Sequence, residues 1–197
     1  MRSVSEEKRK LRKIILASRR SLESNVLADE SLSISEHITS WSNYLKSNIV
    51  MAFAPMADEP QTISIIKHAL ASNKTVCLPY VGEKHGIMSA ALINDLSELV
   101  VGQYGILTPD ISKTSFLNPS DIDLIITPGV AFDFQGKRLG MGAGFYDRFL
   151  PRANNAVLIG LALSCQIVAD IPCEKHDFLV DYLATKDGII NCRTSKM

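Results

Sequence analysis

The chain has 197 residues, of which 46% are hydrophobic and 21% charged, and 21 basic residues balance 21 acidic ones to a net charge of zero. This composition excludes disordered and fibrous proteins, and the length suits one folded unit, so we predict a single domain over residues 1–197. The zero net charge argues against a broad nucleic-acid-binding surface, although small anions remain possible ligands.

The sequence carries no sign of a membrane or export segment. No apolar run approaches the roughly 20 residues that a membrane span needs, and no apolar segment follows the charged N-terminal residues. The four cysteines form neither a C-x-x-C pair nor a metal-ligand spacing; they are Cys77, Cys165, Cys173 and Cys192. We therefore predict a cytoplasmic, monomeric protein with reduced structural cysteines and neither nucleic-acid nor membrane partners.

Two helices are predicted before any strand. Ser5 is predicted to cap the first, because Glu6 and Glu7 then lie in the first turn, where the helix dipole favours acids. Lys8 and Arg12 share one face of this helix. A second helix is predicted over about 26–45, with apolar residues facing inward at Leu27, Ile34, Ile38, Trp41 and Leu45.

From residue 48 onward, short apolar runs alternate with segments of helical spacing. The runs predict strands at 49–54, 75–79, 123–127, 156–163 and 179–184, with helices at 62–72 and 145–152. The segment 81–120, rich in glycine and proline, is less regular. Because the strands are apolar on both faces, we predict an α/β fold: a mainly parallel, Rossmann-like three-layer arrangement with helices on both faces of the sheet, preceded by the two N-terminal helices.

The loop between the strand at 123–127 and the next helix has the features of a phosphate-binding segment. It carries glycines at 140, 142 and 144, which let a ligand approach backbone N–H groups closely near a helix N-terminus. Arg138 offers a bidentate fork for phosphate, and Asp147 offers an oxygen ligand for Mg²⁺. The loop does not match either common nucleotide motif, so spacing alone leaves a tight turn before a helix as the alternative.

The resemblance to a known family becomes specific along this segment. Pro-Gly-Val-Ala-Phe-Asp at 128–133, followed by Gly-x-Arg-Leu-Gly-x-Gly-x-Gly-x-Tyr-Asp at 136–147, resembles the signature of the 5-formyltetrahydrofolate cyclo-ligase (methenyltetrahydrofolate synthetase) family. Outer segments are similar too: Lys8-x-x-x-Arg12, Ala-Pro-Met-Ala-Asp-Glu-x-x-Thr at 54–62, and His-Asp…Val-Asp at 176–181. The resemblance covers almost the whole chain.

The resemblance implies an ATP- and Mg²⁺-dependent conversion of 5-formyltetrahydrofolate to 5,10-methenyltetrahydrofolate, with release of ADP and phosphate. Phosphorylation of the formyl oxygen would precede ring closure by N10 of the same folate. Such chemistry needs positioning and charge neutralisation rather than a protein nucleophile. The sequence agrees, since it offers no convincing Ser-His or Cys-His pairing.

The resemblance also implies roles for particular residues. Lys8 and Arg12 would contact the ATP phosphates, Ala54 and Glu59 would bind folate, and Asp147 and Asp177 would hold Mg²⁺. Arg138 and Tyr146 would act in catalysis, within a segment that wraps the triphosphate: Arg138, Leu139, Gly140, Met141, Gly142, Ala143, Gly144, Phe145 and Tyr146. Taken alone, the residues leave other interpretations open: a solvated helix face for Lys8 and Arg12, and an exposed loop acid for Glu59.

The sequence departs from the family pattern at two positions. Phe145 stands where the family frequently has Tyr, and Ala143 stands where relatives carry Gly or Lys. Tyr104 could stack on the substrate but is predicted to be ordinary packing, and His176 lies beside the proposed metal acid. Two other functions remain to be distinguished: a catalytically silent nucleotide- or folate-binding relative with a regulatory role, and another α/β enzyme that handles phosphate or CoA esters.

Overall fold

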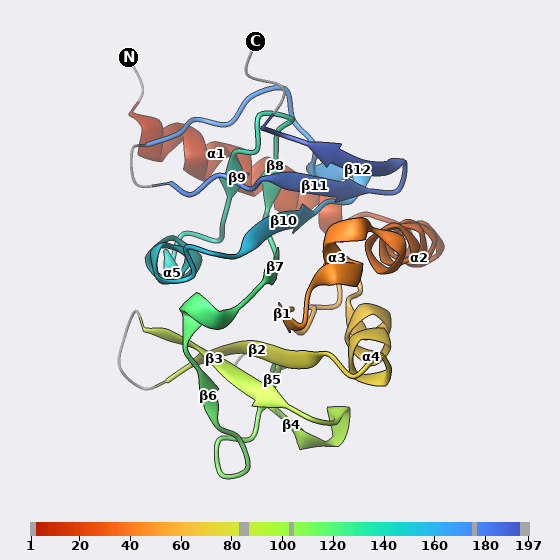
Figure 1. The fold of residues 1–197 in the computed structure, drawn as a ribbon. Helices are drawn as coiled ribbons and strands as arrows, with labels where there is room; N and C mark the ends of the chain where they lie inside the picture. Colours follow the sequence, from red (N-terminus) through yellow and green to blue (C-terminus); the bar gives the residue numbers. More distant parts are fainter. Residues whose placement is uncertain (1–2, 83–86, 103–104, 175–176, 194–197) are drawn as a thin grey trace.

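A computed structural model describes residues 3–82, 87–102, 105–174 and 177–193. Within them the largest element is an eight-stranded sheet of order β12-β11-β10-β7-β1-β2-β3-β6 (Figure 1). The central strands β11, β10, β7, β1 and β2 run parallel, whereas β12, β3 and β6 pair antiparallel. The strands are β1 (Ile49–Met51), β2 (Thr75–Val81), β3 (Met88–Ile93), β6 (Phe116–Leu117), β7 (Leu124–Thr127), β10 (Val157–Leu161), β11 (Tyr182–Thr185) and β12 (Gly188–Asn191). The predicted mainly parallel α/β fold is confirmed.

Alternating side chains of the central strands build a core on each face of the sheet. Val50 of β1 packs in one apolar cluster and its neighbour Met51 packs in another, because successive strand residues point to opposite faces. The first cluster includes side chains from α2 (Ser24–Ser40), α3 (Ser42–Lys46) and α4 (Ile63–Ala71). The second includes Phe149 of α5 (Phe145–Phe149) and Leu150 of the following 3₁₀ turn. Helices therefore cover both faces, as predicted (Figure 1).

The order of the strands places two loops side by side. The chain passes from β1 through α4 to β2 on one side, and from β7 to β10 and β11 on the other, while β1 and β7 are parallel neighbours. The carboxyl ends of β1 and β7 therefore meet where the strand order reverses. Ligands of α/β sheets commonly bind at such a crevice. The loop after β1 carries Glu59, and the segment after β7 leads to Arg138.

Helix α1 (Val4–Arg20) packs on a small hairpin beyond the end of β7. The hairpin consists of β8 (Ala131–Phe132) and β9 (Arg138–Leu139), which the sequence had indicated only as loop. Ile15 of α1 lies in one apolar cluster with Val130, Ala131 and Leu139. The helix that opens the chain is thereby held against the start of the glycine-rich segment, more than 100 residues later in the sequence.

The predicted N-cap at Ser5 is wrong. The hydroxyl of Ser3 accepts from Glu6 N–H at 3.3 Å, and the Glu6 carboxylate accepts from Ser3 N–H at 3.1 Å. This reciprocal capping box satisfies two backbone donors at once, and the helix begins at Val4.

The predicted second helix is divided in two. Trp41, with extended backbone dihedrals, ends α2 and begins α3. Ile34 and Ile38 are buried as predicted, but Leu45 is 57% exposed, so its predicted inward position is wrong. The break changes the direction of the chain, and the helical spacing therefore does not continue to residue 45.

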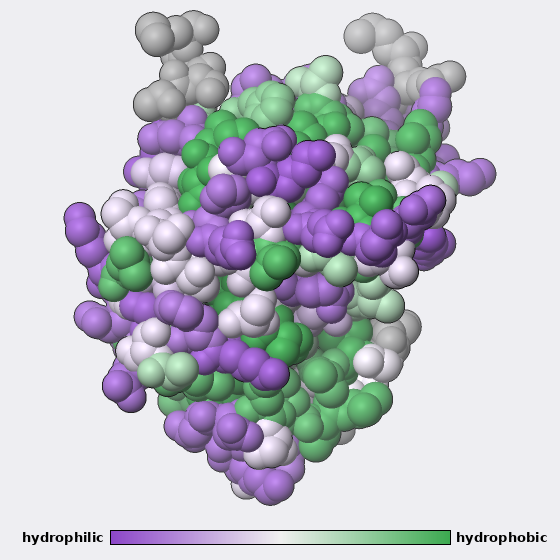
Figure 2. All heavy atoms as spheres, turned by 90° about the vertical axis from the view of Figure 1, so that its right-hand side faces the viewer, coloured by the Kyte–Doolittle hydropathy of each residue, from purple (hydrophilic) through white to green (hydrophobic). Residues whose placement is uncertain are grey.

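The segment 81–120 contains more strand than the sequence indicated. It holds β3 and β6 of the large sheet, and a separate hairpin of β4 (Leu99–Val101) and β5 (Leu107–Pro109). These strands pair antiparallel, and they lack the continuous apolar run that is typical of a buried parallel strand. Figure 2, viewed onto the α2–α4 side, shows polar and apolar side chains interspersed, with one apolar group in the lower half, toward the end with β2 to β6, above a polar lower tip.

The bounds of other strands also differ from the predicted ones. β1 ends at Met51, although Ala52 to Ala54 remain buried, and β11 begins three residues later than predicted. β12 was not predicted. Among the described residues no helix is long and apolar enough to cross a membrane. The four cysteines are free, as expected.

Candidate active site

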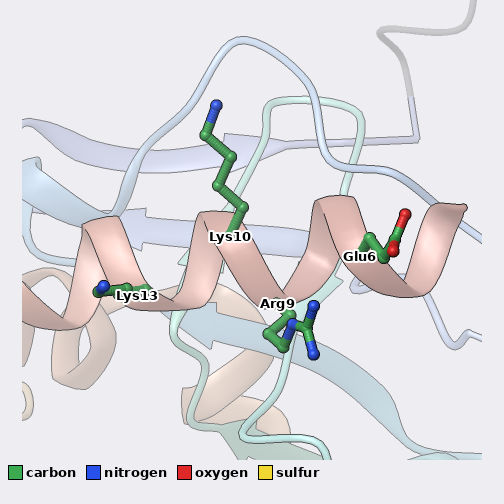
Figure 3. Close-up of a pocket in the computed structure, with 4 residues that line it drawn as sticks. All are labelled: Glu6, Arg9, Lys10 and Lys13. Carbon is green, nitrogen blue, oxygen red and sulfur yellow. The ribbon is translucent and has the colours of Figure 1, made fainter. Parts of the chain in front are cut away.

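One face of helix α1 points toward the protein interior and carries several basic residues. Lys8, Ile15 and Arg19 are buried and Arg12 is half-buried, at spacings of four, three and four that align them on one face. The opposite face lines a surface pocket with Glu6, Arg9, Lys10 and Lys13 (Figure 3). The interpretation of Lys8 as part of a solvated face is therefore wrong.

Lys8 forms ion pairs with acids from the C-terminal part of the chain. Its Nζ lies 2.6 Å from Asp177 Oδ2 and 2.9 Å from Glu174 Oε2. Burial opposes the charge on each partner, but the hydrogen bonds outweigh it: the pKa of Lys8 is raised and that of Asp177 is lowered. Both groups are therefore charged at neutral pH.

Arg12 contacts the glycine-rich loop directly. Its Nε donates to the carbonyl oxygen of Gly140 at 2.7 Å. Gly142 has a φ of +106°, and a Cβ added there would lie 3.5 Å from the Arg12 guanidinium carbon. Glycine at 142 is thus favoured by its backbone conformation. Met141, Gly142 and Ala143 are exposed, so the tip of the loop is accessible.

Arg138 lies at the inner end of this loop. Its side chain is 3% exposed, its Nη2 donates to Asp147 Oδ1 at 2.7 Å, and its guanidinium carbon is 5.3 Å from the centre of the Tyr146 ring. The buried Nε of Arg138 and the buried hydroxyl of Tyr146 have no hydrogen-bond partner among the described residues. Since buried polar atoms are normally paired, this is where a polar ligand fits. Burial raises the pKa of Tyr146, so its hydroxyl stays protonated.

The helix that follows the loop is short. α5 covers five residues and continues as a 3₁₀ turn, so the helix predicted over 145–152 is only partly α-helical. Its N-cap is Gly144 with a φ of +68°, and no side chain caps it. So short a helix has a small macrodipole. The predicted polyanion site at a helix N-terminus therefore depends on the cationic side chains instead.

Glu59 is buried rather than exposed, which rules out the interpretation as an exposed loop acid. Its side chain is 8% exposed; Oε2 accepts from Met56 N–H at 3.0 Å, and Oε1 lies 3.6 Å from Arg19 Nη1, an ion-pair distance too long for a hydrogen bond. Burial raises the pKa of Glu59, while Arg19 opposes the rise. Ala54, the other predicted folate residue, is buried in the same segment.

Arg19 is the residue that sequence reasoning missed. It donates to both carboxylate oxygens of the neighbouring Asp58, at 3.0 and 3.1 Å. The signal was available, because Arg19 lies seven residues beyond Arg12 and eleven beyond Lys8, on the same helix face. It was obscured because Arg20 and other basic residues surround it in the sequence.

The structure brings some predicted site residues together and separates others. Arg138 lies against the Tyr146 ring; burial raises the pKa of Tyr146, the positive charge of Arg138 opposes the rise, and the negative charge of Glu59 adds to it. Asp147 pairs with Arg138, whereas Asp177 pairs with Lys8. No group of three or more metal-ligating side chains occurs in the described ranges, and the shared Mg²⁺ role of the two acids stays a prediction. Tyr104 and His176 lie outside the described residues.

Comparison with known proteins decides the family. The family model of the 5-formyltetrahydrofolate cyclo-ligases matches residues 4–186. The chain belongs to this family. The 5-formyltetrahydrofolate cyclo-ligase of Haemophilus influenzae is 32% identical over 149 residues, 74% of this chain and 79% of that one. The cyclo-ligase of Saccharomyces cerevisiae is 31% identical, over 93% of this chain and 95% of its own.

A solved structure agrees in fold as well as in sequence. The 5,10-methenyltetrahydrofolate synthetase of Aquifex aeolicus is 31% identical, and the match covers 96% of this chain and 95% of that chain with a TM-score of 0.83. Membership confirms that the chain is an enzyme of the cyclo-ligase family, a ligase of folate one-carbon metabolism. It removes the alternative of an unrelated α/β enzyme for phosphate or CoA esters.

Proposed function

We propose that the protein converts 5-formyltetrahydrofolate to 5,10-methenyltetrahydrofolate in a reaction that consumes ATP and requires Mg²⁺. The observation that carries this proposal is the meeting of two loops at the carboxyl ends of the parallel neighbours β1 and β7: one loop carries the buried acid Glu59, and the other leads to Arg138, whose buried Nε has no hydrogen-bond partner among the described residues. An acid suited to a folate and a cationic loop suited to phosphate thereby face one site.

The cationic side supports binding of the triphosphate. Arg138 offers its unpaired Nε, and Lys8 and Arg12 approach from α1. Residues 141–143 at the tip of the glycine loop are exposed, so phosphate oxygens can approach the N–H groups there. Ala143 and Phe145 add no charge, so the clamp depends on Arg138, Lys8 and Arg12.

The carboxylates of Asp147 and Asp177 are the residues proposed to hold Mg²⁺. Their oxygens are the hard ligands that Mg²⁺ prefers, and each already lies beside a cation proposed to bind phosphate, Arg138 for Asp147 and Lys8 for Asp177. When bound, the ion supplies charge neutralisation at the phosphates. Asp147 and Asp177 keep the two cations in place in its absence.

Glu59 and Ala54 are proposed to bind the folate. The Glu59 carboxylate accepts hydrogen bonds, which suits the N–H groups at the edge of a pterin ring. Ala54 adds a small apolar contact at the start of the same segment. The protonated hydroxyl of Tyr146 is available as a donor to oxygen atoms of the substrate.

In the proposed reaction the formyl oxygen attacks the γ-phosphorus of ATP, and ADP leaves. N10 of the same folate then attacks the formyl carbon, and the carbon–oxygen bond breaks with release of phosphate, which leaves the methenyl bridge. Arg138 stabilises negative charge on the transferred group, and Tyr146 and Glu59 fix the folate relative to it. No protein nucleophile takes part.

The test is an absorbance assay. Purified protein with Mg-ATP and 5-formyltetrahydrofolate is expected to produce the near-ultraviolet absorbance of the methenyl product, and omission of ATP or Mg²⁺ should abolish it. A folded protein that produces none at high enzyme concentration would contradict the proposal and favour the silent, regulatory relative. The cytoplasmic location, monomeric state and absence of nucleic-acid partners remain predictions.

A further inference from the structure

We propose that Arg19 is a positioning residue of the folate site: it anchors the loop after β1 to helix α1 and holds Glu59 in its binding position. The inference rests on the proposed function, since it assigns Arg19 to the folate that Glu59 is proposed to bind. Neither the motifs of the sequence nor the proposed reaction assigns a role to this residue.

The contacts of Arg19 are those of an anchor. Its side chain is only 2% exposed, although a long charged side chain at a helix end is usually solvated. Nε and Nη2 both donate to the Asp58 carboxylate, a bidentate geometry that fixes direction as well as distance. Nη1, the remaining nitrogen, lies 3.6 Å from Glu59 Oε1. One guanidinium therefore spans two consecutive acids of the loop.

The loop has few other fixed points around Glu59. Met56 N–H donates to the Glu59 carboxylate, and the Gln61 side chain donates to the carbonyl oxygens of Met56 and Glu59. These bonds join the loop to itself and determine its local shape. Two contacts join the loop to other elements. Gln61 N–H donates to Ser31 Oγ of α2 at 3.0 Å, two residues beyond Glu59, whereas Arg19 of α1 contacts Asp58 and Glu59 themselves. The orientation of Glu59 toward the site therefore depends most directly on Arg19.

Helix α1 links this anchor to the nucleotide side. Lys8, Arg12 and Arg19 lie on one face of one helix, and the eleven residues from Lys8 to Arg19 span roughly 16 Å. The first two contact the 174–177 segment and the glycine loop, and the third contacts the Glu59 loop. A continuous helix is rigid over this length. It therefore fixes the separation of the two half-sites, which in-line transfer between two bound substrates requires.

Arg19 also affects Glu59 electrostatically, through the pKa of the Glu59 carboxyl group. Arg19 of α1 lies 3.6 Å from the Glu59 carboxylate and Asp58 adjoins Glu59 in the loop, while the charge of Glu59 in turn adds to the raised pKa of Tyr146 in α5. Burial and Asp58 favour the protonated acid, and Arg19 favours the carboxylate. Removal of Arg19 should therefore raise the pKa of Glu59 further, and folate binding that needs the carboxylate should then be lost at a higher pH.

The experiment is calorimetric titration of the full chain with 5-formyltetrahydrofolate and, separately, with a non-hydrolysable ATP analogue, across pH. Arg19→Met is expected to weaken folate binding at least tenfold, to move its acid limb to higher pH, and to leave nucleotide binding within about twofold. Arg19→Lys should recover only part of the affinity, because an ammonium cannot reproduce the bidentate contact. The matched control is Arg20→Met, at the exposed neighbouring arginine, which should behave as wild type.

Each outcome has a defined meaning. Equal weakening of folate and nucleotide binding, or an unmoved acid limb, would show that Arg19 has only a structural role. If Arg19→Met does not fold, Asp58→Asn removes the ionised partner while Arg19 remains; it should weaken folate binding severalfold, and unchanged binding would overturn the inference. A wild-type protein that binds no 5-formyltetrahydrofolate would overturn the proposed function itself, and the role of Arg19 with it.

Discussion

The two ends of helix α1 hold their charges in different ways. At the N-terminal end Lys8 pairs with Glu174 and Asp177, whose side chains are 41% and 16% exposed. At the C-terminal end Arg19 is 2% exposed, and its partners Asp58 and Glu59 are 25% and 8% exposed. A phosphate that arrives from solvent can compete for Lys8, because its acid partners can turn to water at little cost. Arg19 and Glu59 are enclosed, and breaking their arrangement would leave a charge buried without its partner.

The comparison indicates that the ion pairs on the nucleotide side can rearrange when a ligand binds. On the folate side, the charged groups already have their arrangement in the free protein. Arg138 combines both properties: it is buried like Arg19, and it follows the nucleotide side through its position at the inner end of the glycine loop. Each of the two arginines keeps one buried nitrogen without a hydrogen-bond partner among the described residues, Nε of Arg138 and Nη1 of Arg19. Substitutions at these positions should therefore have effects of different size and kind.

The largest effect is expected at Arg138. Arg138→Met should lower kcat/KM by about 10²–10³-fold, the typical cost of removing one preorganised group that stabilises transition-state charge. Arg138→Lys should recover little, because the fork geometry is lost. Steady-state kinetics measures both, with the exposed Arg152→Met as a control of matched chemistry that should retain activity. Near-normal ATP kinetics in Arg138→Met would remove Arg138 from the nucleotide side.

Glu59→Gln should produce a smaller and selective loss. It keeps the size of the side chain and removes its charge, so folate affinity should fall about 10–100-fold, as expected for charge-assisted hydrogen bonds. KM for ATP should stay near the wild-type value. The acid limb of folate binding should also disappear, since burial raises the pKa of Glu59 and this group is proposed to cause that limb. An acid limb that persists in the variant would assign the titration to another group.

The variants Asp147→Asn and Asp177→Asn test whether these two carboxylates bind the same Mg²⁺ ion. If both carboxylates hold Mg²⁺, each variant should need roughly tenfold more Mg²⁺ for half-maximal activity, since each loses an ionised oxygen ligand. Magnesium titrations at saturating ATP give the comparison. A raised KM for ATP with unchanged Mg²⁺ dependence in Asp177→Asn would mean that Asp177 serves only to position Lys8.

The smallest effect is expected on stability, at Tyr146. Its buried hydroxyl has no partner among the described residues, so Tyr146→Phe should raise the free energy of unfolding of the free protein by about 1 kcal/mol while turnover falls. Tyr44→Phe is the matched comparison, because the Tyr44 hydroxyl bonds His68 Nδ1 at 2.8 Å and its loss should destabilise by about 1 kcal/mol. Denaturant unfolding measures both. Equal destabilisation by the two changes would show that the Tyr146 hydroxyl is satisfied.

The contrast between strands shows what apolar patterning can predict. The parallel strands β1, β2, β7 and β10 were all located from sequence, because both of their faces are buried and their apolar runs are nearly continuous. The antiparallel strands β3 and β6 and the hairpin β4–β5 were not located, since they lie in the segment rich in glycine and proline, where no continuous apolar run marks a strand. Trp41 shows a similar limit: nothing in the helical spacing around it indicated that the chain would turn there.

The sequence by itself determined the fold class, the glycine-rich loop with Arg138 and Asp147, and the family resemblance that named Lys8, Arg12, Glu59 and Asp177. These features depend on local residue order, which a sequence states directly. Only the tertiary structure decided which charges meet: Lys8 with Asp177, Arg138 with Asp147, and Arg19 with Asp58 and Glu59. Such pairs join residues up to 169 positions apart. Their partners are set by the order of the strands and the packing of α1, and no local pattern along the chain records that.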